Sequence, residues 1–176
     1  AHAFEILPDL HGSLKAAYQQ FGIRGQVVRA AVTNESGMAH IMVPHSSKVF
    51  GWESSGIKDS TLPVTTSSNA KDGYTGKVHQ MTFRSLKLEA LALDDYIQRQ
   101  RLERIHFLSI DAERQDALVL RGAHESLSRH MIDIVEMELT RNGWTGGSVV
   151  EILRWLDSIS YQCFWQAKSC LIPISG

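Results

Sequence analysis

The stretch 107-FLSIDAERQDALVLRGA-123 joins an apolar run, two acids and a helical pattern. The apolar run, residues 107–110, predicts a buried strand that stops at Asp111. Glu113 follows two residues later, and apolar residues then recur at helical spacing. Carboxylates at the exit of a strand can orient a substrate hydroxyl, act as a base or bind a hard cation. They can equally well cap the helix expected over residues 115–128, so both explanations stay open.

Around this stretch, predicted strands alternate with predicted helices. Apolar periodicity and turn residues predict strands at 1–6, 26–32, 39–43, 78–86, 105–110, 132–139, 161–167 and 170–174, and helices at 8–21, 94–105, 115–128 and 149–159. This alternation predicts an α/β fold with a doubly wound, mostly parallel sheet covered on both faces, in one domain over residues 1–176. The last two strands can pair as a hairpin.

Residues 44–76 differ from the rest because they are rich in Ser, Thr, Gly and Lys and show little periodicity. They predict a loop insert, longer than the ~12–15 residues of ordinary connections. A lid over a substrate and plain disorder explain such an insert equally well.

Composition excludes several classes of protein. The chain has 176 residues and is 43% hydrophobic, enough for a sizeable core and unlike a disordered tail. Its 18 basic and 19 acidic residues give a formal net charge of −1, which provides no attraction toward nucleic acid or an anionic membrane. No apolar run approaches the ~20 residues that span a bilayer. Cys163 and Cys170 fit no metal spacing; we expect reduced thiols, with a disulfide as the alternative.

Other strand ends also carry acids. In open α/β sheets, ligands bind at the carboxyl ends of the strands. The first predicted strand ends at Glu5, and an acid there can accept hydrogen bonds from the ribose of a nucleotide-like cofactor. Taken alone, Glu5 is better explained as a capping or solvated residue. The Asp94-Asp95 pair is likewise better explained as an N-cap and a first-turn acid than as a catalytic pair.

Five segments together resemble the FkbM-type S-adenosylmethionine-dependent methyltransferases. The family signature is an apolar strand, then roughly Lys-Ile-Asp-Val-Glu-Gly-x-Glu, then a helix ending Leu-Lys-Gly-Ala. The positions that match it are Asp111, Glu113, Leu120, Gly122 and Ala123. The other matching segments, in the family's order, are Ala3-Phe4-Glu5 with Pro8, Ala30-Ala31-Val32 followed by Gly37, 93-LDDYI-97 and 134-IVEMEL-139. The resemblance covers nearly the whole chain.

The sequence also departs from the family pattern. Ser109 stands where the family has Lys, Arg114 where it has Gly, and Asp116 where it has a second Glu. A bulky Arg114 either crowds the site or pairs harmlessly with a neighbouring acid. The family's glycine-rich loop, Asp-x-Gly-x-x-x-Gly, has no counterpart before Glu5, so the resemblance implies a missing N-terminal strand, loop and helix. Because residue 1 falls within a predicted strand, we expect a piece of a longer chain rather than a true loss.

The resemblance implies methyl transfer from S-adenosylmethionine to a hydroxyl of a sugar or other small-molecule acceptor. It implies that Glu5 holds the cofactor ribose, that Ala31 and Val32 line the adenine pocket, and that Asp111 or Glu113 takes the acceptor's proton. A metal held by these two acids and a third is less favoured, because no tight ligand motif is present.

Two other functions remain open at this point. The first is a catalytically inactive methyltransferase-like scaffold or subunit of a larger assembly. The missing loop, Ser109 and Arg114 favour it. The second is a different doubly wound nucleotide-binding domain, because a fold does not fix a function.

Overall fold

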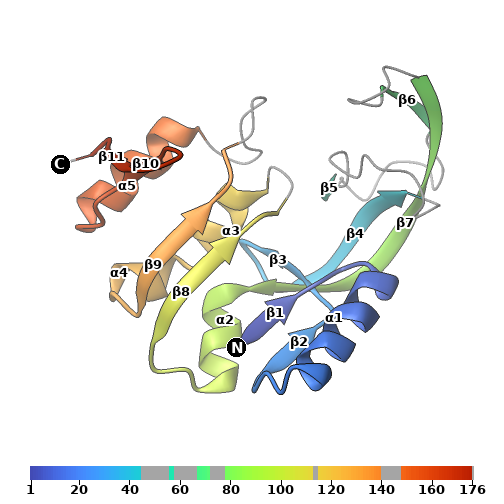
Figure 1. Ribbon diagram of the computed structural model, residues 1–176, viewed down its shortest axis with the longest axis horizontal. Helices are drawn as coiled ribbons and strands as arrows, with labels where there is room; N and C mark the ends of the chain where they lie inside the picture. The colour runs from blue at the N-terminus through green and yellow to red at the C-terminus, as the bar shows by residue number, and fades with distance from the viewer. Residues whose placement is uncertain (45–55, 58–66, 72–77, 113–114, 140–147, 176) are drawn as a thin grey trace. The chain divides into compact units, whose positions relative to one another are not determined.

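The computed structural model of the chain describes residues 1–44, 56–57, 67–71, 78–112, 115–139 and 148–175 (Figure 1). Within these ranges, side chains are described outside residues 42–84. The chain divides into two compact units, Ala1–Leu91 and Ala92–Gly176, and each unit is described by itself.

The first unit opens with a strand, a helix and a second strand parallel to the first. β1 (His2–Phe4) pairs with β2 (Gln26–Val28), and α1 (Pro8–Gln20) connects them and packs against β2 (Figure 1). This is the βαβ connection that parallel pairing requires. Pro8 opens α1, since a proline at the first helical position lacks only an N–H that would have no helical partner.

Five further strands make up the rest of the described part of the first unit. They are β3 (Ala31–Thr33), β4 (Gly37–Pro44), β5 (Gly56–Ile57), β6 (Ser67–Lys71) and β7 (Val78–Ala92). They are ordered β3-β7-β4-β5, and β6 also pairs with β7. The β4–β5, β4–β7 and β6–β7 pairs among them are antiparallel. The β4–β7 ladder runs from Gly37↔Ala90 to Pro44↔Phe83. The apolar core of this sheet consists of Ala31, Ala39, Ile41, Leu88 and Ala90.

Two sequence predictions are wrong in this unit. The single strand predicted over residues 26–32 is two strands, because β2 pairs with β1 whereas β3 pairs with β7. The loop predicted over residues 44–76 contains β5 and β6, which pair with β4 and β7. The remainder of that predicted loop lies outside the described residues. Cross-strand partners hold these short strands, and their own Ser- and Gly-containing sequences give little strand signal.

The second unit begins where β7 ends, because α2 (Leu93–Gln100) follows Ala92 directly. A second strand–helix–strand arrangement follows, made of β8 (Ile105–Ile110), α3 (Asp116–Gly122), α4 (His124–Ser128) and β9 (Ile132–Met137). β8 and β9 are parallel, and their register runs from Ile105↔Ile132 to Ile110↔Met137. The single helix predicted over residues 115–128 is therefore two short helices that meet at Ala123.

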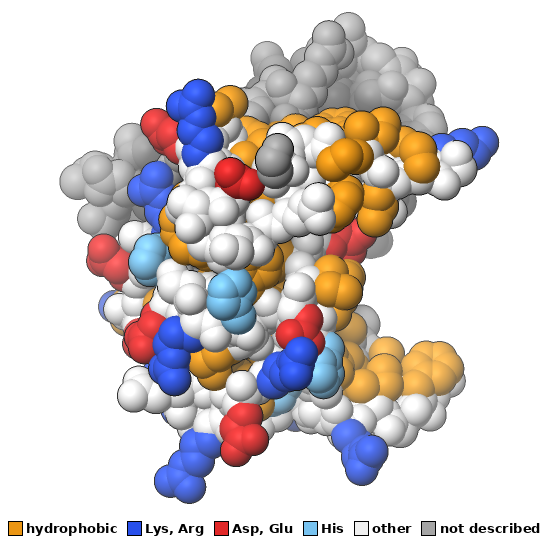
Figure 2. Space-filling view, turned by 90° about the vertical axis from the view of Figure 1, so that its left-hand side faces the viewer, with side chains coloured by type: hydrophobic (Ala, Val, Ile, Leu, Met, Phe, Trp, Pro, Cys, Tyr) orange, Lys and Arg blue, Asp and Glu red, His pale blue; other side chains and the backbone are white. Residues whose placement is uncertain are grey.

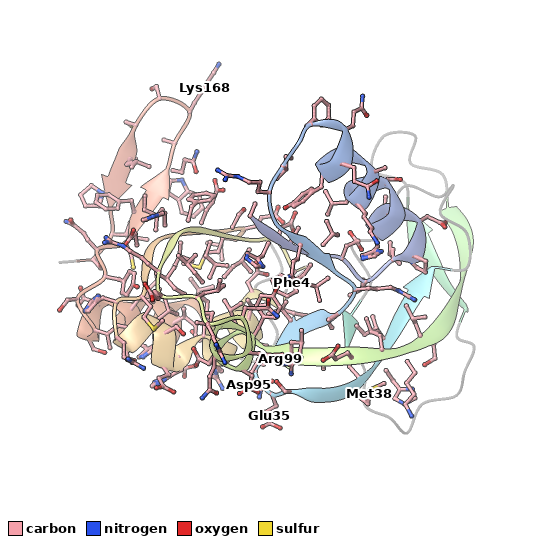
Figure 3. The ribbon with its side chains drawn as sticks, turned by 90° about the horizontal axis from the view of Figure 1, so that it is seen from below. Phe4, Glu35, Met38, Asp95, Arg99 and Lys168 are labelled. Carbon is pink, nitrogen blue, oxygen red and sulfur yellow. The ribbon has the colours of Figure 1, made fainter. Side chains whose placement is uncertain are left out.

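A helix and a hairpin complete the second unit. They are α5 (Val149–Ser158) and the strands β10 (Phe164–Gln166) and β11 (Leu171–Pro173). The hairpin is antiparallel, as predicted, and Lys168 lies at its turn (Figure 3). α5 buries Ile152 and Leu156 from its predicted apolar face. His124 of α4 stacks on Trp155 of α5, with ring centroids 5.1 Å apart and planes 7° from parallel.

Four helices end in the same hydrogen-bond motif. The residues just past α1, α2, α4 and α5 have positive φ angles: Gly22 at 61°, Arg101 at 52°, His130 at 52° and Ser160 at 66°. After α1, Ile23 N donates to Tyr18 O at 2.8 Å, and the other three helices end in the equivalent bond. Glycine adopts this conformation without steric cost, and the helix predicted over residues 8–21 ends here within one residue. No glycine marks Arg101, and the helix predicted to extend to residue 105 ends early there.

The α/β class is confirmed, since each unit contains a parallel strand pair connected through helices. The doubly wound, mostly parallel sheet is not confirmed, because the described strands form four separate small sheets and the β4–β5, β4–β7 and β6–β7 pairs are antiparallel. The prediction that residues 107–110 are buried is wrong in part. Of these residues only Ile110 is buried, while Phe107 and its neighbour Ile134 on β9 are 55% and 57% exposed. Both thiols are free, with Cys163 buried and Cys170 exposed. On the face shown in Figure 2, acidic and basic side chains are interspersed, in keeping with the balanced composition.

Candidate functional site

Glu5 lies where β1 leads into α1. The β1–β2 ladder extends one residue past β1, because Glu5 N donates to Val28 O at 3.1 Å. The Glu5 Oε1 atom accepts a hydrogen bond from Leu7 N at 2.7 Å. The carboxylate is therefore held at the carboxyl end of a parallel strand pair, and its second oxygen has no partner among the hydrogen bonds described for it. That position suits an acid that binds ligand hydroxyl groups.

Ala31 and Val32 lie in β3 of the same unit. Ala31 is 5% exposed and belongs to the apolar core of the five-stranded sheet, whereas Val32 is half-buried. Ile6 and Leu7, the two residues after Glu5, pack against this same core. The structure therefore brings Glu5 into the neighbourhood of β3. Within this pair, Val32 has the side chain that is more accessible to a ligand.

Asp111 lies just past β8 in the second unit and is exposed, while Ile110 before it is buried. The alternative role proposed for it was capping of the next helix. The N-cap position of α3 is Gln115, and no side-chain hydrogen bond caps that helix. Asp111 therefore remains available to solvent and to a ligand. Glu113 and Arg114 lie outside the described residues.

Asp116, at the start of α3, was not singled out as a site residue by the sequence. Its side chain is 1% exposed, and neither carboxylate oxygen has a hydrogen-bond partner among the described residues. Burial raises the pKa of Asp116, and the negative charges of Asp111 and Glu138 raise it further. The backbone amides of Ala112 and Asp116 oppose this change, but neither makes a hydrogen bond of normal geometry to the carboxylate.

Three acids therefore interact electrostatically at the carboxyl end of the β8–β9 pair. Glu138 comes just after β9, and its backbone N donates to Ile110 O at 3.3 Å, which continues the ladder next to Asp111. One rung earlier, Ser109 Oγ donates to Glu136 Oε2 at 3.3 Å. Ser109 is thus a weak partner for this carboxylate.

The opposite end of the β8–β9 pair carries a separate charged cluster. Asp133 accepts hydrogen bonds from Arg104 Nε at 3.0 Å and from His106 Nδ1 at 2.7 Å. Arg104, and then His106, hold the pKa of Asp133 below its usual value. His106 is largely exposed. This cluster lies at the starts of the two strands, away from the end where ligands bind in such sheets.

The Asp94-Asp95 pair has a structural role, as predicted, but the N-cap part of that prediction is wrong. α2 begins at Leu93, so neither acid is its N-cap. Asp94 instead accepts hydrogen bonds from Glu125 N at 2.8 Å, Ser126 N at 2.9 Å and Ser126 Oγ at 2.5 Å, and so caps α4. Asp95 is a first-turn acid of α2 and lies one turn from Arg99 (Figure 3).

The described residues contain neither a candidate metal site nor a membrane-spanning helix. Across the described ranges, no group of three or more His, Cys, Asp or Glu side chains has the arrangement needed to hold a metal ion. The acids around Asp116 thus interact through their charges without forming such a group. None of the helices that the structure describes has both the length and the apolar character needed to cross a bilayer.

The predicted site residues fall into two groups. Glu5, Ala31 and Val32 belong to the first unit, and Asp111 belongs to the second. Asp116 and Glu138 join Asp111. The sequence signal that could have identified Asp116 is its distance of five residues from Asp111. An acid that starts the helix so soon after the strand lies close to the end of that strand.

Comparison with known sequences gives one match. Residues 2–163 match the sequence model of the Methyltransferase FkbM domain, which covers most of the chain and includes β1, β8, α3 and β9. No curated protein and no solved structure matches the chain.

Proposed function

Because the chain belongs to the FkbM methyltransferase domain family, we propose that it transfers a methyl group from S-adenosylmethionine to a hydroxyl oxygen of a sugar or other small-molecule acceptor. The observation that carries the proposal is the placement of acids at the carboxyl ends of parallel strands, Glu5 after β1 and Asp111 after β8. In doubly wound, mostly parallel sheets, these ends bind ligands, and the parallel pair in each unit supports that fold here.

Glu5 would hold the ribose of the cofactor. Its Oε1 atom is anchored by Leu7 N, which leaves Oε2 to accept hydrogen bonds from ribose hydroxyls. The adjacent apolar segment of β3, in which Val32 is half-buried, would line the adenine pocket. These residues fit the cofactor because a fixed carboxylate can accept hydrogen bonds from the ribose and the nearby apolar surface can contact the adenine.

Asp111 would act as the base on the acceptor. When bound, S-adenosylmethionine supplies an electrophilic methyl group on a sulfonium. Asp111 would take the proton of the acceptor hydroxyl as that oxygen accepts the methyl group. Asp111 is exposed, so it can then release the proton to water. Glu113 is the second candidate for this role.

Cofactor binding tests the role of Glu5. Glu5→Gln keeps an oxygen that can accept from Leu7 N but removes the charge, so the local fold should persist. Charged hydrogen bonds contribute roughly 1.5–3 kcal/mol, so we expect affinity for S-adenosylmethionine, measured by calorimetry on the full chain, to fall about 10- to 100-fold. Glu5→Ala should also weaken binding, whereas Glu35→Ala, an exposed acid of the same unit, should not. Unchanged affinity in both Glu5 variants would remove this residue from the site.

Methyl transfer tests the role of the strand-exit acids. A general base contributes roughly 10²–10⁴ in rate, so Asp111→Asn should lower transfer by about that factor with little change in melting temperature. Glu113→Gln should do the same if it is the base. Glu136→Gln, an exposed acid one rung away, is the control. Loss of melting temperature without loss of transfer would favour a structural role instead.

One observation favours the alternative of an inactive scaffold. The family has Lys at the position of Ser109, and the contact of Ser109 with Glu136 is long, at 3.3 Å. A chain that folds but binds no S-adenosylmethionine would support the scaffold.

A further inference from the structure

The carboxyl group of Asp116 is the least satisfied polar group described in the second unit. It is 1% exposed, and both of its oxygens lack a hydrogen-bond partner among the described residues. An ionised carboxylate in such a place is strongly unfavourable unless a cation or several donors compensate it. None of the ion pairs described for this unit includes Asp116.

The charges around Asp116 make ionisation less favourable still. Asp111, after β8, and Glu138, after β9, both act on it with negative charge. Helix α2 also packs against α3, and its acid Asp94 is committed to the N-terminus of α4 by three hydrogen bonds. When several acids share a place, the one that is most buried and least hydrogen-bonded takes up a proton first. Asp116 is that acid, because Asp111 and Glu138 are exposed.

We propose that Asp116 is the first of these acids to take up a proton as the pH falls and is the positioning partner of Asp111, so that, once it is protonated, the end of the β8–β9 pair carries two negative charges and one neutral carboxyl group. The functional part of this proposal rests on the proposed role of Asp111 as base. The proton on a neutral Asp116 is buried and out of reach of solvent. Asp111, which is exposed, is then the acid that is free to take the acceptor proton and pass it to water. An ionised Asp116 would instead add a third negative charge beside the base.

Carbon-13 NMR of aspartate carboxyl groups tests the protonation state directly. The Asp116 signal, assigned by its loss in Asp116→Asn, should keep the position of a protonated carboxyl above pH 3.8, the ordinary value for aspartate. Its titration should move to lower pH in Asp111→Asn and in Glu138→Gln, because each variant removes a neighbouring negative charge. Asp133→Asn, at the opposite end of the same strands, should leave the curve in place. Titration of Asp116 at or below pH 3.8, or equal curves in all three variants, would overturn the proposal.

The pH dependence of methyl transfer tests the functional part. The wild-type profile should contain a step at the pH where the Asp116 signal titrates. Asp116→Asn should lack that step, since an amide cannot ionise, and Asp116→Glu should restore one. A step that persists in Asp116→Asn would remove Asp116 from the chemistry. If the wild-type chain transfers no methyl group at all, the proposed function fails, while the NMR titration still decides where the proton resides.

Discussion

The carboxylate of Asp94 accepts three hydrogen bonds from the first turn of α4, a helix 31 residues further along the chain. Replacing a capping acid by alanine typically costs about 1–2 kcal/mol. We therefore expect Asp94→Ala to lower the unfolding free energy by about that amount, measured by urea denaturation with an unchanged slope.

The adjacent acid supplies the control. Asp95 is exposed and interacts with the dipole of α2, which is worth only about 0.3–1 kcal/mol. Asp95→Ala should therefore cost less than Asp94→Ala. Equal losses in the two variants would contradict the larger contribution expected from the hydrogen bonds of Asp94.

Asp116 should make stability depend on pH. Burial raises its folded-state pKa above the 3.8 of the unfolded chain, so between those two values the folded protein binds more protons. The unfolding free energy should therefore fall as the pH rises through that interval. Asp116→Asn cannot ionise, so its stability relative to wild type should rise over the same interval, as followed by denaturation at a series of pH values.

Asp133 should behave in the opposite way. Arg104 and His106 lower its folded-state pKa, so its contribution is present above pH 3.8 and is lost as the pH falls through the folded value. In Asp133→Asn, this loss of stability as the pH falls should be absent. Curves of the same sign for the two asparagine variants would contradict these assignments.

Single residues were predictable from sequence where a strand exit determined their place. Glu5 and Asp111 do lie at the ends of parallel strands. Asp94 was misassigned because its partner, Ser126, is distant in sequence and belongs to another helix. The burial of Asp116 likewise depends on how α3 packs after β8, which no local pattern encodes.

At the scale of elements, α1 contains two glycines with opposite expected effects. Gly12 lies in the helix interior, Gly22 has a φ of 61°, and an added Cβ would meet no atom within 4 Å at either. Gly12→Ala should therefore stabilise the protein by about 0.5–1 kcal/mol through helix propensity. Gly22→Ala should destabilise it by about 1–2 kcal/mol, because alanine is strained in the left-handed region.

Thermal unfolding monitored by circular dichroism measures both variants. Because neither Cβ has a neighbour within 4 Å, packing changes do not confuse the comparison. Two shifts of the same sign would show that conformational preference does not govern the end of α1.

The elements that sequence predicted best have strong local signals. The proline and glycine that bound α1 and the apolar face of α5 are examples. The elements it missed depend on distant partners: β5 and β6 on β4 and β7, and the break between β2 and β3 on different sheets. The helix α2 ends at Arg101, which has a positive φ angle although it is not a glycine. The local sequence therefore does not indicate where this helix ends.

For the molecule as a whole, we expect one cooperative unfolding transition, as a single domain would show. β7 runs to Ala92 and α2 begins at Leu93, so no linker separates the two units in sequence. Far-ultraviolet circular dichroism and tryptophan fluorescence should therefore give coincident curves. Two resolved transitions would show that the units unfold independently.

Family and class were accessible from sequence because ordered motifs span most of the chain, and the match over residues 2–163 confirms them. The antiparallel β4–β7 ladder was not anticipated. Its two strands were each predicted as extended segments, but their antiparallel pairing joins residues more than 38 positions apart, as in Pro44↔Phe83. Which strands pair at such a separation depends on all the other strand pairings that the chain could form.

The bonds between Asp94 and Ser126 also have a kinetic meaning. They span 32 positions and close a segment that contains all of β8 and α3. Bringing such distant residues together costs chain entropy before any packing is gained. The change in the folding activation free energy of Asp94→Ala, divided by its change in stability, would show when these bonds form. A ratio near one means that they form before the rate-limiting barrier, and a ratio near zero means that they form after it.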